Sequence, residues 1–223
     1  MKRFSGFLAL FLISFSLVAQ TATTDTAATA LLQRVSAKYK AYKNISANFR
    51  LIVQAPKVKP DDDEKKLADT LKGDVLLEGA KFKISIKDQQ IICDGKTIWT
   101  YIPSDSRVQE NYFEDEDDVF SPTKIFTFYK EGFSYQIKEK KTVGGKNITV
   151  IEMIPANRKT TYFRIEVTID DAALQITETR IFDKNGTRYT YKLQKQTPNT
   201  TTGADTFTFD PKKYPGVKVE NLK

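Results

Sequence analysis

The stretch "QQIICDGKTIWTYIP", residues 89–103, contains two apolar runs that meet at an Asp-Gly pair. Such a pair between runs rich in β-branched and aromatic residues predicts a β-hairpin with a tight turn. In the second strand, Ile98 and Ile102 face one side while Trp99 and Tyr101 face the other. Because both faces are apolar, something must cover both. We expect the bulky Trp99 and Tyr101 to suit an interior between the sheet and the helices, with loops or a partner covering the other face.

Short strand-like segments recur along the whole chain. Residues 45–53 alternate, with Phe49, Leu51 and Val53 on one face and Ser46, Asn48 and Arg50 on the other. Turn signals such as Gly-Gly and Asn-Gly separate the later segments. The eleven candidate strands cover residues 45–53, 68–78, 80–88, 89–93, 96–103, 106–113, 133–141, 146–154, 161–169, 174–183 and 187–195.

Two segments have helical patterns instead. Residues 26–42 place their apolar side chains on one face, and these are Leu31, Leu32, Val35, Tyr39 and Tyr42. Residues 122–131 follow a natural N-cap, Ser121, begin with a proline and end at Gly132. This second helix is unusually aromatic. Because neither helix has a helical neighbour in sequence, we expect both to pack on the concave face of a curved sheet.

Such packing leaves two possibilities open. The interior is either a solid core or an apolar cavity with the second helix as its lid. Alternating strands without a repeat or a linker predict one mainly β domain over residues 20–223.

The first 19 residues have the pattern of a secretory signal peptide. Lys2 and Arg3 precede an apolar stretch, Phe7–Val18, that is too short to span a bilayer comfortably, and Ala19 suits cleavage. We therefore expect an exported protein.

The composition excludes several function classes. The chain has no histidine, which removes imidazole bases, Ser-His and Cys-His nucleophilic pairs and most zinc sites. Its single cysteine, Cys93, cannot form an internal disulfide. The formal charge of +7 comes from scattered basic residues, a distribution that does not favour nucleic-acid binding. The acidic run in residues 57–66 is typical of a solvated loop rather than a metal site.

Five segments together resemble the LolA family of periplasmic lipoprotein carriers. They cover essentially the whole chain after residue 19, in order, and are "NISANFRLIVQ" (44–54), "CDGKTIWTYIP" (93–103), "SPTKIFTFY" (121–129), "FRIEVTIDDAALQITETRIFDKNGTRYTYKL" (163–193) and "FTFDPKKYPGVKV" (207–219). The resemblance implies an unclosed antiparallel β-barrel of about eleven strands with a helical lid. It also implies a non-enzymatic, monomeric carrier in the periplasm that uses no cofactor. Such a carrier receives acylated lipoproteins from an inner-membrane ABC-type release complex and delivers them to an outer-membrane receptor or the membrane surface.

The family's cavity positions map onto apolar residues of this chain. Phe82 matches a cavity phenylalanine, and Leu76, Ile84 and Ile86 match cavity-facing positions, as do Ile125 and Phe126 of the lid. With the alternation of residues 45–53 and the hairpin aromatics, the expected lipid-binding cavity comprises Leu51, Val53, Leu76, Phe82, Ile84, Ile86, Trp99, Tyr101, Ile125, Phe126 and Tyr129.

One departure from the family pattern concerns the lid. Well-known members carry an arginine before the cavity phenylalanine that ties the lid closed, and here that position falls on Gly79. Lys81 and Arg50 are the candidate substitutes, but strand alternation directs both away from Phe82, so we expect a lid held by apolar contacts. The departure keeps a second reading open, a carrier or sensor of another amphiphilic lipid or glycolipid. A third, catalysis by pairs such as Glu114/Asp117 or Asp61/Glu64, is disfavoured because these carboxylates lie in solvated runs.

Overall fold

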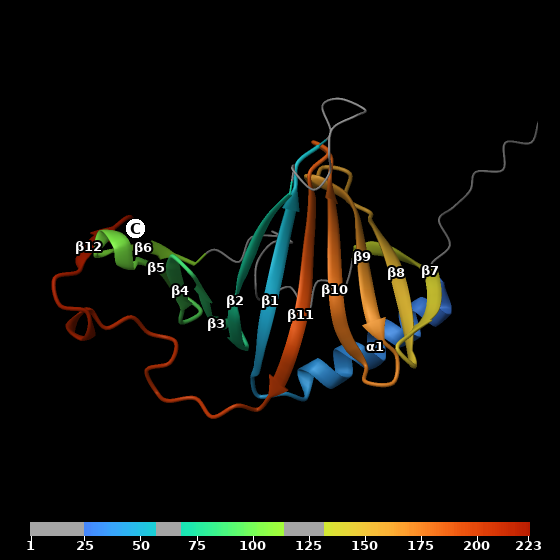
Figure 1. The fold of residues 1–223 in the computed structure, drawn as a ribbon, viewed down its shortest axis with the longest axis horizontal. Helices are drawn as coiled ribbons and strands as arrows, with labels where there is room; N and C mark the ends of the chain where they lie inside the picture. The colour runs from blue at the N-terminus through green and yellow to red at the C-terminus, as the bar shows by residue number, and fades with distance from the viewer. Residues whose placement is uncertain (1–24, 57–67, 114–131) are drawn as a thin grey trace, which may run out of the picture.

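A computed structural model of the chain describes residues 25–56, 68–113 and 132–223 (Figure 1). The described chain forms one open sheet with the strand order β12-β6-β5-β4-β3-β2-β1-β11-β10-β9-β8-β7. The first meander consists of β1 (Ile45–Gln54), β2 (Ala68–Glu78), β3 (Lys81–Ile86), β4 (Gln89–Cys93), β5 (Thr97–Ile102) and β6 (Arg107–Tyr112). The second consists of β7 (Phe133–Val143), β8 (Lys146–Pro155), β9 (Tyr162–Asp170), β10 (Gln175–Asp183) and β11 (Arg188–Pro198). The unclosed, mainly β architecture predicted from the sequence is confirmed.

The two meanders join where β1 pairs antiparallel with β11. Sequence patterns predicted eleven strands, but a twelfth, β12 (Lys218–Asn221), adds parallel to β6. Alternation failed to reveal it because it has four residues, all of them at the surface or only partly buried. Backbone bonds from Lys218 N to Ser106 O (2.8 Å) and from Leu222 N to Glu110 O (2.9 Å) hold it at the sheet edge.

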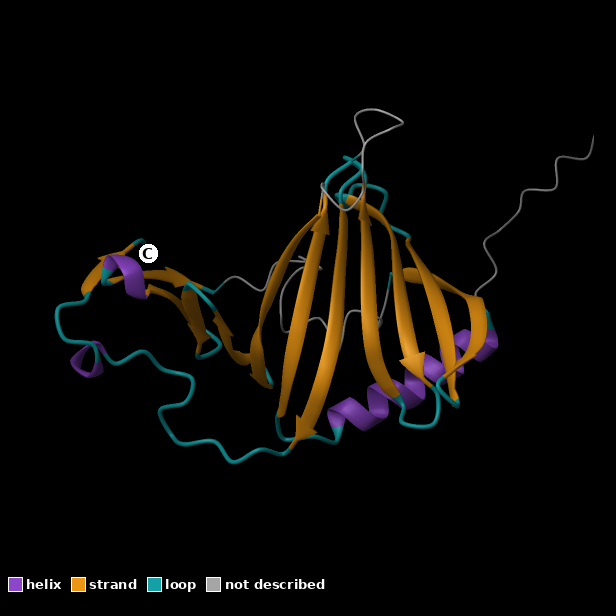
Figure 2. Cartoon of the chain, viewed as in Figure 1, coloured by secondary structure: helices purple, strands orange, loops and turns teal. Residues whose placement is uncertain are grey.

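Helix α1 (Thr26–Lys40), predicted over residues 26–42, lies across the strand ends of the second meander (Figure 2). Asp25 caps its first turn and accepts bonds from the backbone N–H groups of Ala27 (2.8 Å) and Ala28 (3.3 Å). At the other end, the Tyr39 hydroxyl donates to Gln196 Oε1 (2.6 Å). The buried side chains of α1 share one helix face and are Ala28, Leu32, Val35 and Tyr39. The second predicted helix, residues 122–131, lies outside the described residues, as does the predicted signal peptide.

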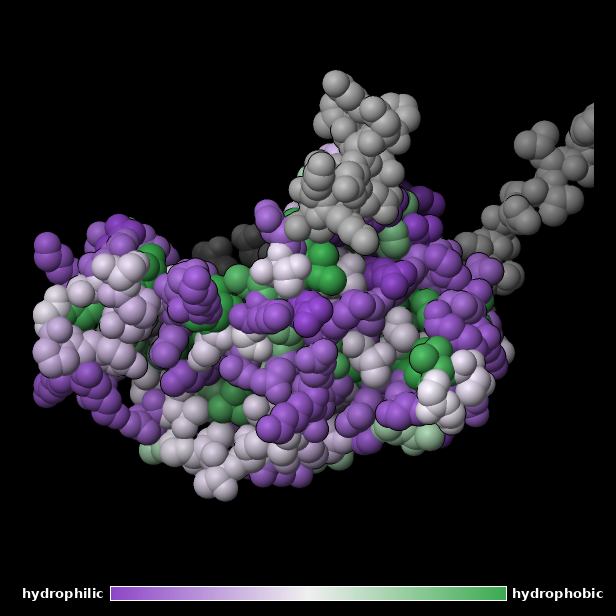
Figure 3. Space-filling view, in the orientation of Figure 1, coloured by the Kyte–Doolittle hydropathy of each residue, from purple (hydrophilic) through white to green (hydrophobic). Residues whose placement is uncertain are grey.

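We call the side of the sheet against which α1 packs the inner face. It contributes the main core, in which Ile151, Ile165 and Val167 are fully buried. The opposite, outer face carries a second, smaller core over β4–β6, built from Ile92, Val108 and Phe209. Elsewhere the side seen in Figure 3 is mainly hydrophilic.

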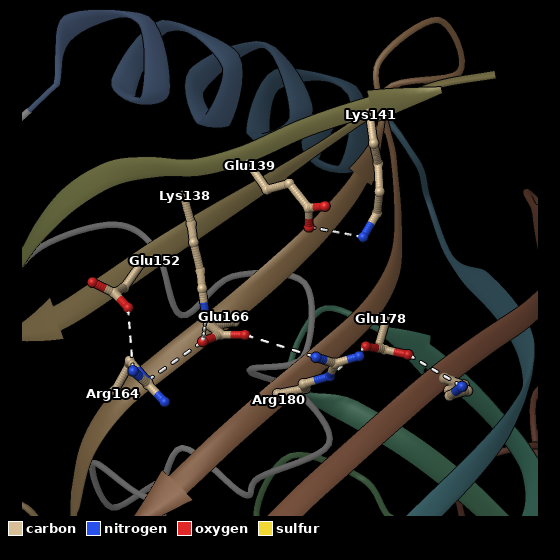
Figure 4. Close-up of polar contacts among 9 residues, drawn as sticks. Lys138, Glu139, Lys141, Glu152, Arg164, Glu166, Glu178 and Arg180 are labelled. Atoms are coloured by element: carbon tan, nitrogen blue, oxygen red, sulfur yellow. Dashed lines mark hydrogen bonds and ion pairs between the residues drawn. The ribbon is translucent and has the colours of Figure 1, made fainter. Parts of the chain in front are cut away.

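On the outer face of β7–β10, ion pairs surround the buried carboxylate of Glu166. Glu166 is 2% exposed and lies between Lys138 Nζ (2.5 Å) and the guanidinium groups of Arg164 (3.4 Å) and Arg180 (3.9 Å) (Figure 4). A buried charge is tolerated only when cations compensate it. Lys138 belongs to a β-bulge of the edge strand β7, so its bond ties that edge to β9.

A glycine allows the sheet to bend between β2 and β3. A Cβ at Gly73 would lie 2.3 Å from the Ser85 carbonyl oxygen, 2.7 Å from Ile86 Cγ2 and 3.0 Å from Phe49 Cζ. Only a residue without a side chain fits this close approach. Beyond it, β3–β6 swing out from the rest of the sheet in Figure 1.

Candidate functional site

The inner face is covered unevenly. The inner-face side chains of β8–β10 are buried, whereas β1–β5 carry buried side chains together with others that remain partly accessible. The partly buried apolar side chains of this region are Phe49, Leu51, Val53, Ile86, Ile91, Ile98, Phe113, Tyr189 and Tyr191, with Leu71 38% exposed beside them. We call this set the open apolar zone. Because water contacts on such groups are unfavourable, the zone suits an apolar ligand.

Strand register brings the zone together from distant parts of the chain. Leu51 of β1 pairs with Leu71 of β2 on one side and with Tyr191 of β11 on the other. Toward β3, the Phe82 ring meets the Phe113 ring edge-on, with centroids 5.5 Å apart. The inner face is therefore a continuous apolar surface from β11 to β5.

Six of the predicted site residues belong to β1–β3, and five of these six lie on the inner face. Phe82 is 1% exposed and Ile84 is also buried, so these two belong to the core beneath the zone. Ile86 is partly buried and lies next to Gly73. Leu51 and Val53 lie on β1, across β2 from the β3 residues. Cys93 is buried opposite Phe82.

Leu76 is the sixth of these residues, and its predicted placement is wrong. It lies between Val75 and Leu77, which both enter the main core, and it pairs with Ser46 and Lys83 on the outer face. Three further predicted residues, Ile125, Phe126 and Tyr129, lie outside the described residues.

The predicted placement of Trp99 and Tyr101 in the interior is also wrong. Ile98 pairs with Cys93 on the inner face, so strand alternation directs Trp99 and Tyr101 outward. There the C-terminal segment covers them, with the Tyr101 ring centroid 4.7 Å from that of Tyr214. Both faces of the hairpin are covered, as its pattern required, but the large aromatics belong to the outer core.

The sequence-based site omitted four aromatic residues of the open zone. Tyr189 and Tyr191 alternate in β11, and Phe49 belongs to the same alternating run as Leu51. Alternation could have found these three. Phe113 follows a strand directly and carries no such signal, since only tertiary packing brings it to Phe82.

Neither Arg50 nor Lys81 takes the place of the family's lid arginine next to Phe82. Arg50 pairs with Lys72 and Lys192 on the outer face, and Lys81 is exposed at the turn after Gly79. Lys81 lines a polar pocket of about 250 Å³ together with Lys43, Glu78 and Asp94. The outward direction predicted for both cations is confirmed.

Perturbed titrating groups lie at caps and turns rather than on the open apolar zone. The N–H of Ala173, followed by the Lys146 ammonium, lowers the pKa of Asp170 at the end of β9. Backbone N–H groups of the first helical turn, with Ala27 foremost, lower the pKa of Asp25. Lys213 lowers the pKa of Asp205 through a direct hydrogen bond. These shifts stabilise the charged carboxylates at a helix cap and at turns. In the described ranges, no three acidic or cysteine side chains gather into a possible metal site.

A sequence profile described as outer membrane lipoprotein carrier protein LolA matches residues 43–210. The chain belongs to the LolA family. The match includes β1 to β11 and therefore both meanders of the sheet. No curated protein sequence matches the chain.

One solved structure agrees with the fold of this LolA family member over most of its length. An uncharacterized conserved protein from Thermus thermophilus is 11% identical and covers 88% of this chain and 99% of its own, with a TM-score of 0.55. Two others are more distant in shape. A LolA superfamily protein from Nitrosomonas europaea is 14% identical over 84% of this chain and 98% of its own, with a TM-score of 0.44. The Mycobacterium tuberculosis lipoprotein LppX is 14% identical over 79% of this chain and 99% of its own, with a TM-score of 0.46.

In the part of the chain that the structure describes, no helix is long and apolar enough to cross a membrane.

Proposed function

We propose that this protein is a periplasmic carrier that shields the acyl chains of lipoproteins on their way from the inner to the outer membrane. The observation that carries the proposal is the open apolar zone, a continuous apolar surface that α1 leaves partly uncovered. Membership of the LolA family supports it. The role is one of binding without catalysis.

The energetics of acyl chains fit such a surface. Burial of each CH₂ group contributes about 0.8 kcal/mol, so one long chain gains on the order of 10 kcal/mol on leaving water. A carrier therefore needs an apolar surface of comparable extent. It must also release its cargo, and a surface that the described residues cover only in part meets both needs.

The remaining features of the proposal concern export and partners. Residues 1–19 have the composition of a signal peptide, and residues 20–223 would form the exported carrier domain. We propose that it acts as a monomer. An inner-membrane ABC-type release complex would load it with acylated lipoprotein, and an outer-membrane receptor or the membrane surface would accept the cargo.

Two neighbouring residues of β1 provide the test. Leu51 lies on the inner face and Ile52 on the outer face, and both side chains are partly buried. A charge at Leu51 would sit in the acyl-binding surface, whereas the same charge at Ile52 would not. We expect Leu51→Glu to reduce binding of acylated lipoprotein at least tenfold, a loss of about 1.4 kcal/mol, and Ile52→Glu to bind like wild type. Equal binding by both folded variants would contradict the proposed surface.

A carrier or sensor of another amphiphilic lipid is the second candidate. It is favoured by Gly79, which stands where the family's lid arginine is expected. Gly79 is exposed, and a Cβ added to it would meet no atom within 4 Å. Mass spectrometry of what co-purifies from the cell envelope separates the two candidates. Acylated lipoprotein supports the first, and a glycolipid or free lipid alone supports the second.

A further inference from the structure

A buried hydroxyl group without a hydrogen-bond partner in the described chain lies on the inner face. Thr179 of β10 is 3% exposed, and its hydroxyl oxygen has no hydrogen-bond partner in the described chain. Its neighbours in register are Val167 of β9 and Tyr191 of β11, both on the inner face. A buried hydroxyl without a partner destabilises a fold, and valine would fill the same space without that penalty.

The position of Thr179 marks a boundary on the inner face. A single row of paired residues crosses five neighbouring strands and continues onto β2. From the covered end to the open end, it runs through Ile151, Val167, Thr179, Tyr191, Leu51 and Leu71. The first two are fully buried, while Tyr191 and Leu51 are partly buried and Leu71 is 38% exposed. The hydroxyl thus lies where the packed core gives way to the open apolar zone.

Water is a poor partner for this hydroxyl. A buried water molecule needs two to four polar neighbours, and the side chains paired with Thr179, Val167 and Tyr191, supply at most one, the Tyr191 hydroxyl. An acceptor carried on an apolar ligand would satisfy the hydroxyl without bringing other polar groups inside.

We infer that the Thr179 hydroxyl donates a hydrogen bond to the carbonyl oxygen of a bound fatty acyl group. This inference rests on the proposed function and specifies the chemistry of its ligand. Three strand spacings separate Thr179 from Leu71, a span of about 14 Å. A palmitoyl chain is long enough to cover this span, with its carbonyl at Thr179 and its hydrocarbon over Tyr191, Leu51 and Leu71.

The test compares ester and ether lipids. Dipalmitoylglycerol and dihexadecylglycerol carry chains of the same length, but only the first has acyl carbonyl groups. Each is used to displace anilinonaphthalene sulfonate from the purified protein. We expect wild type to prefer the ester by roughly three- to tenfold, Thr179→Val to lose this preference, and Thr179→Ser, which keeps the hydroxyl, to retain it.

Thermal unfolding of the lipid-free protein provides a second, independent measurement. Thr179→Val removes an unpartnered group and should raise Tm by about 2–4 °C. Thr149→Val is the matched control, because the buried Thr149 hydroxyl donates to Asp171 Oδ2 (2.8 Å) and its loss should lower Tm.

The outcomes distinguish this inference from the carrier proposal. Equal affinity of wild type for both lipids, or a lower Tm for Thr179→Val, would overturn the hydroxyl contact and leave the carrier intact. Failure of both lipids to displace the dye would overturn the carrier proposal and the contact with it.

Discussion

At the scale of single residues, Gly73 determines how closely β3 and Phe49 approach β2. An added methyl group would meet the backbone oxygen of Ser85 at 2.3 Å, which a change of side-chain rotamer cannot relieve. The strand itself must shift.

We expect Gly73→Ala to destabilise the protein by about 1–3 kcal/mol, as overpacked cores do. Urea denaturation measures this change. Gly203→Ala is the control, because its nearest neighbour is the carboxylate oxygen of Asp205 at 3.2 Å and its φ is not positive. An equally stable Gly73→Ala protein would show that β3 can move freely.

Asp170 illustrates a residue whose charge stabilises a turn. Its folded-state pKa lies below the ordinary value of 3.8, first because Ala173 N–H donates to it and then because of Lys146. Its contribution is present above the unfolded-state pKa and is lost as the pH falls through the folded-state pKa. We therefore expect Asp170→Asn to lower Tm at neutral pH and the difference from wild type to shrink below about pH 4. Melting curves across that range test this, and a pH-independent difference would argue against the charge.

At the scale of elements, the edge strand β7 depends on its bulge. Lys138 projects from the bulge to the buried Glu166, so the edge strand is bonded to β9 across β8. This contact supplements the backbone ladder between β7 and β8.

We expect Lys138→Met to reduce stability by about 1 kcal/mol, because a partner of a buried carboxylate is lost while two arginines remain. Amide hydrogen exchange in β7 should also be faster in the Lys138→Met protein than in wild type. Lys140→Met is the control, an exposed lysine of the same strand, and should change stability by less than about 0.5 kcal/mol. Similar exchange in both variants would mean that the bulge lysine does not hold the edge.

The C-terminal segment is the element that covers the outer face of β4–β6. Tyr214 stacks on Phe209 with ring centroids 4.7 Å apart and contacts Tyr101. Trp99 packs against the same cluster and is the single tryptophan of the chain, so its fluorescence reports on this cover.

We expect Tyr214→Ala to shift Trp99 emission to longer wavelength and to cost about 1–3 kcal/mol of stability. Tyr112→Ala on β6 is the control, since Tyr112 is 65% exposed. An unchanged emission spectrum in the Tyr214 variant would show that Tyr214 does not shield Trp99 from water.

At the scale of the whole molecule, the open sheet has one interior and the helix covers only part of it. Arg50 faces outward and Lys81 lies in an exposed turn, so neither is directed at Phe82. If the proposed carrier closes over its cargo, closure depends on apolar contacts.

We expect cargo transfer to acceptor membranes to be unchanged in Arg50→Ala and Lys81→Ala proteins and insensitive to salt, because screening weakens exposed ion pairs and leaves apolar contacts alone. Loss of transfer by either folded variant would show that a charged latch exists.

The sequence by itself predicted most of the elements that the structure describes and which side chains share a face. Alternation placed Leu51 and Val53 on one face, helical periodicity identified the buried face of α1, and turn residues set most strand boundaries to within a few positions. These signals are local, since the direction of a side chain along a strand or a helix follows from the backbone period alone.

Only the tertiary structure decided which apolar face looks inward. Alternation showed that Trp99 and Ile98 point to opposite sides, but the inward side was settled by the pairing of Ile98 with Cys93 and by the C-terminal segment over Trp99. The same holds for β12, Phe113 and the isolated hydroxyl of Thr179, whose environments are made by segments far away in the sequence. Burial is a property of what packs on a side chain, and a local pattern does not contain that information.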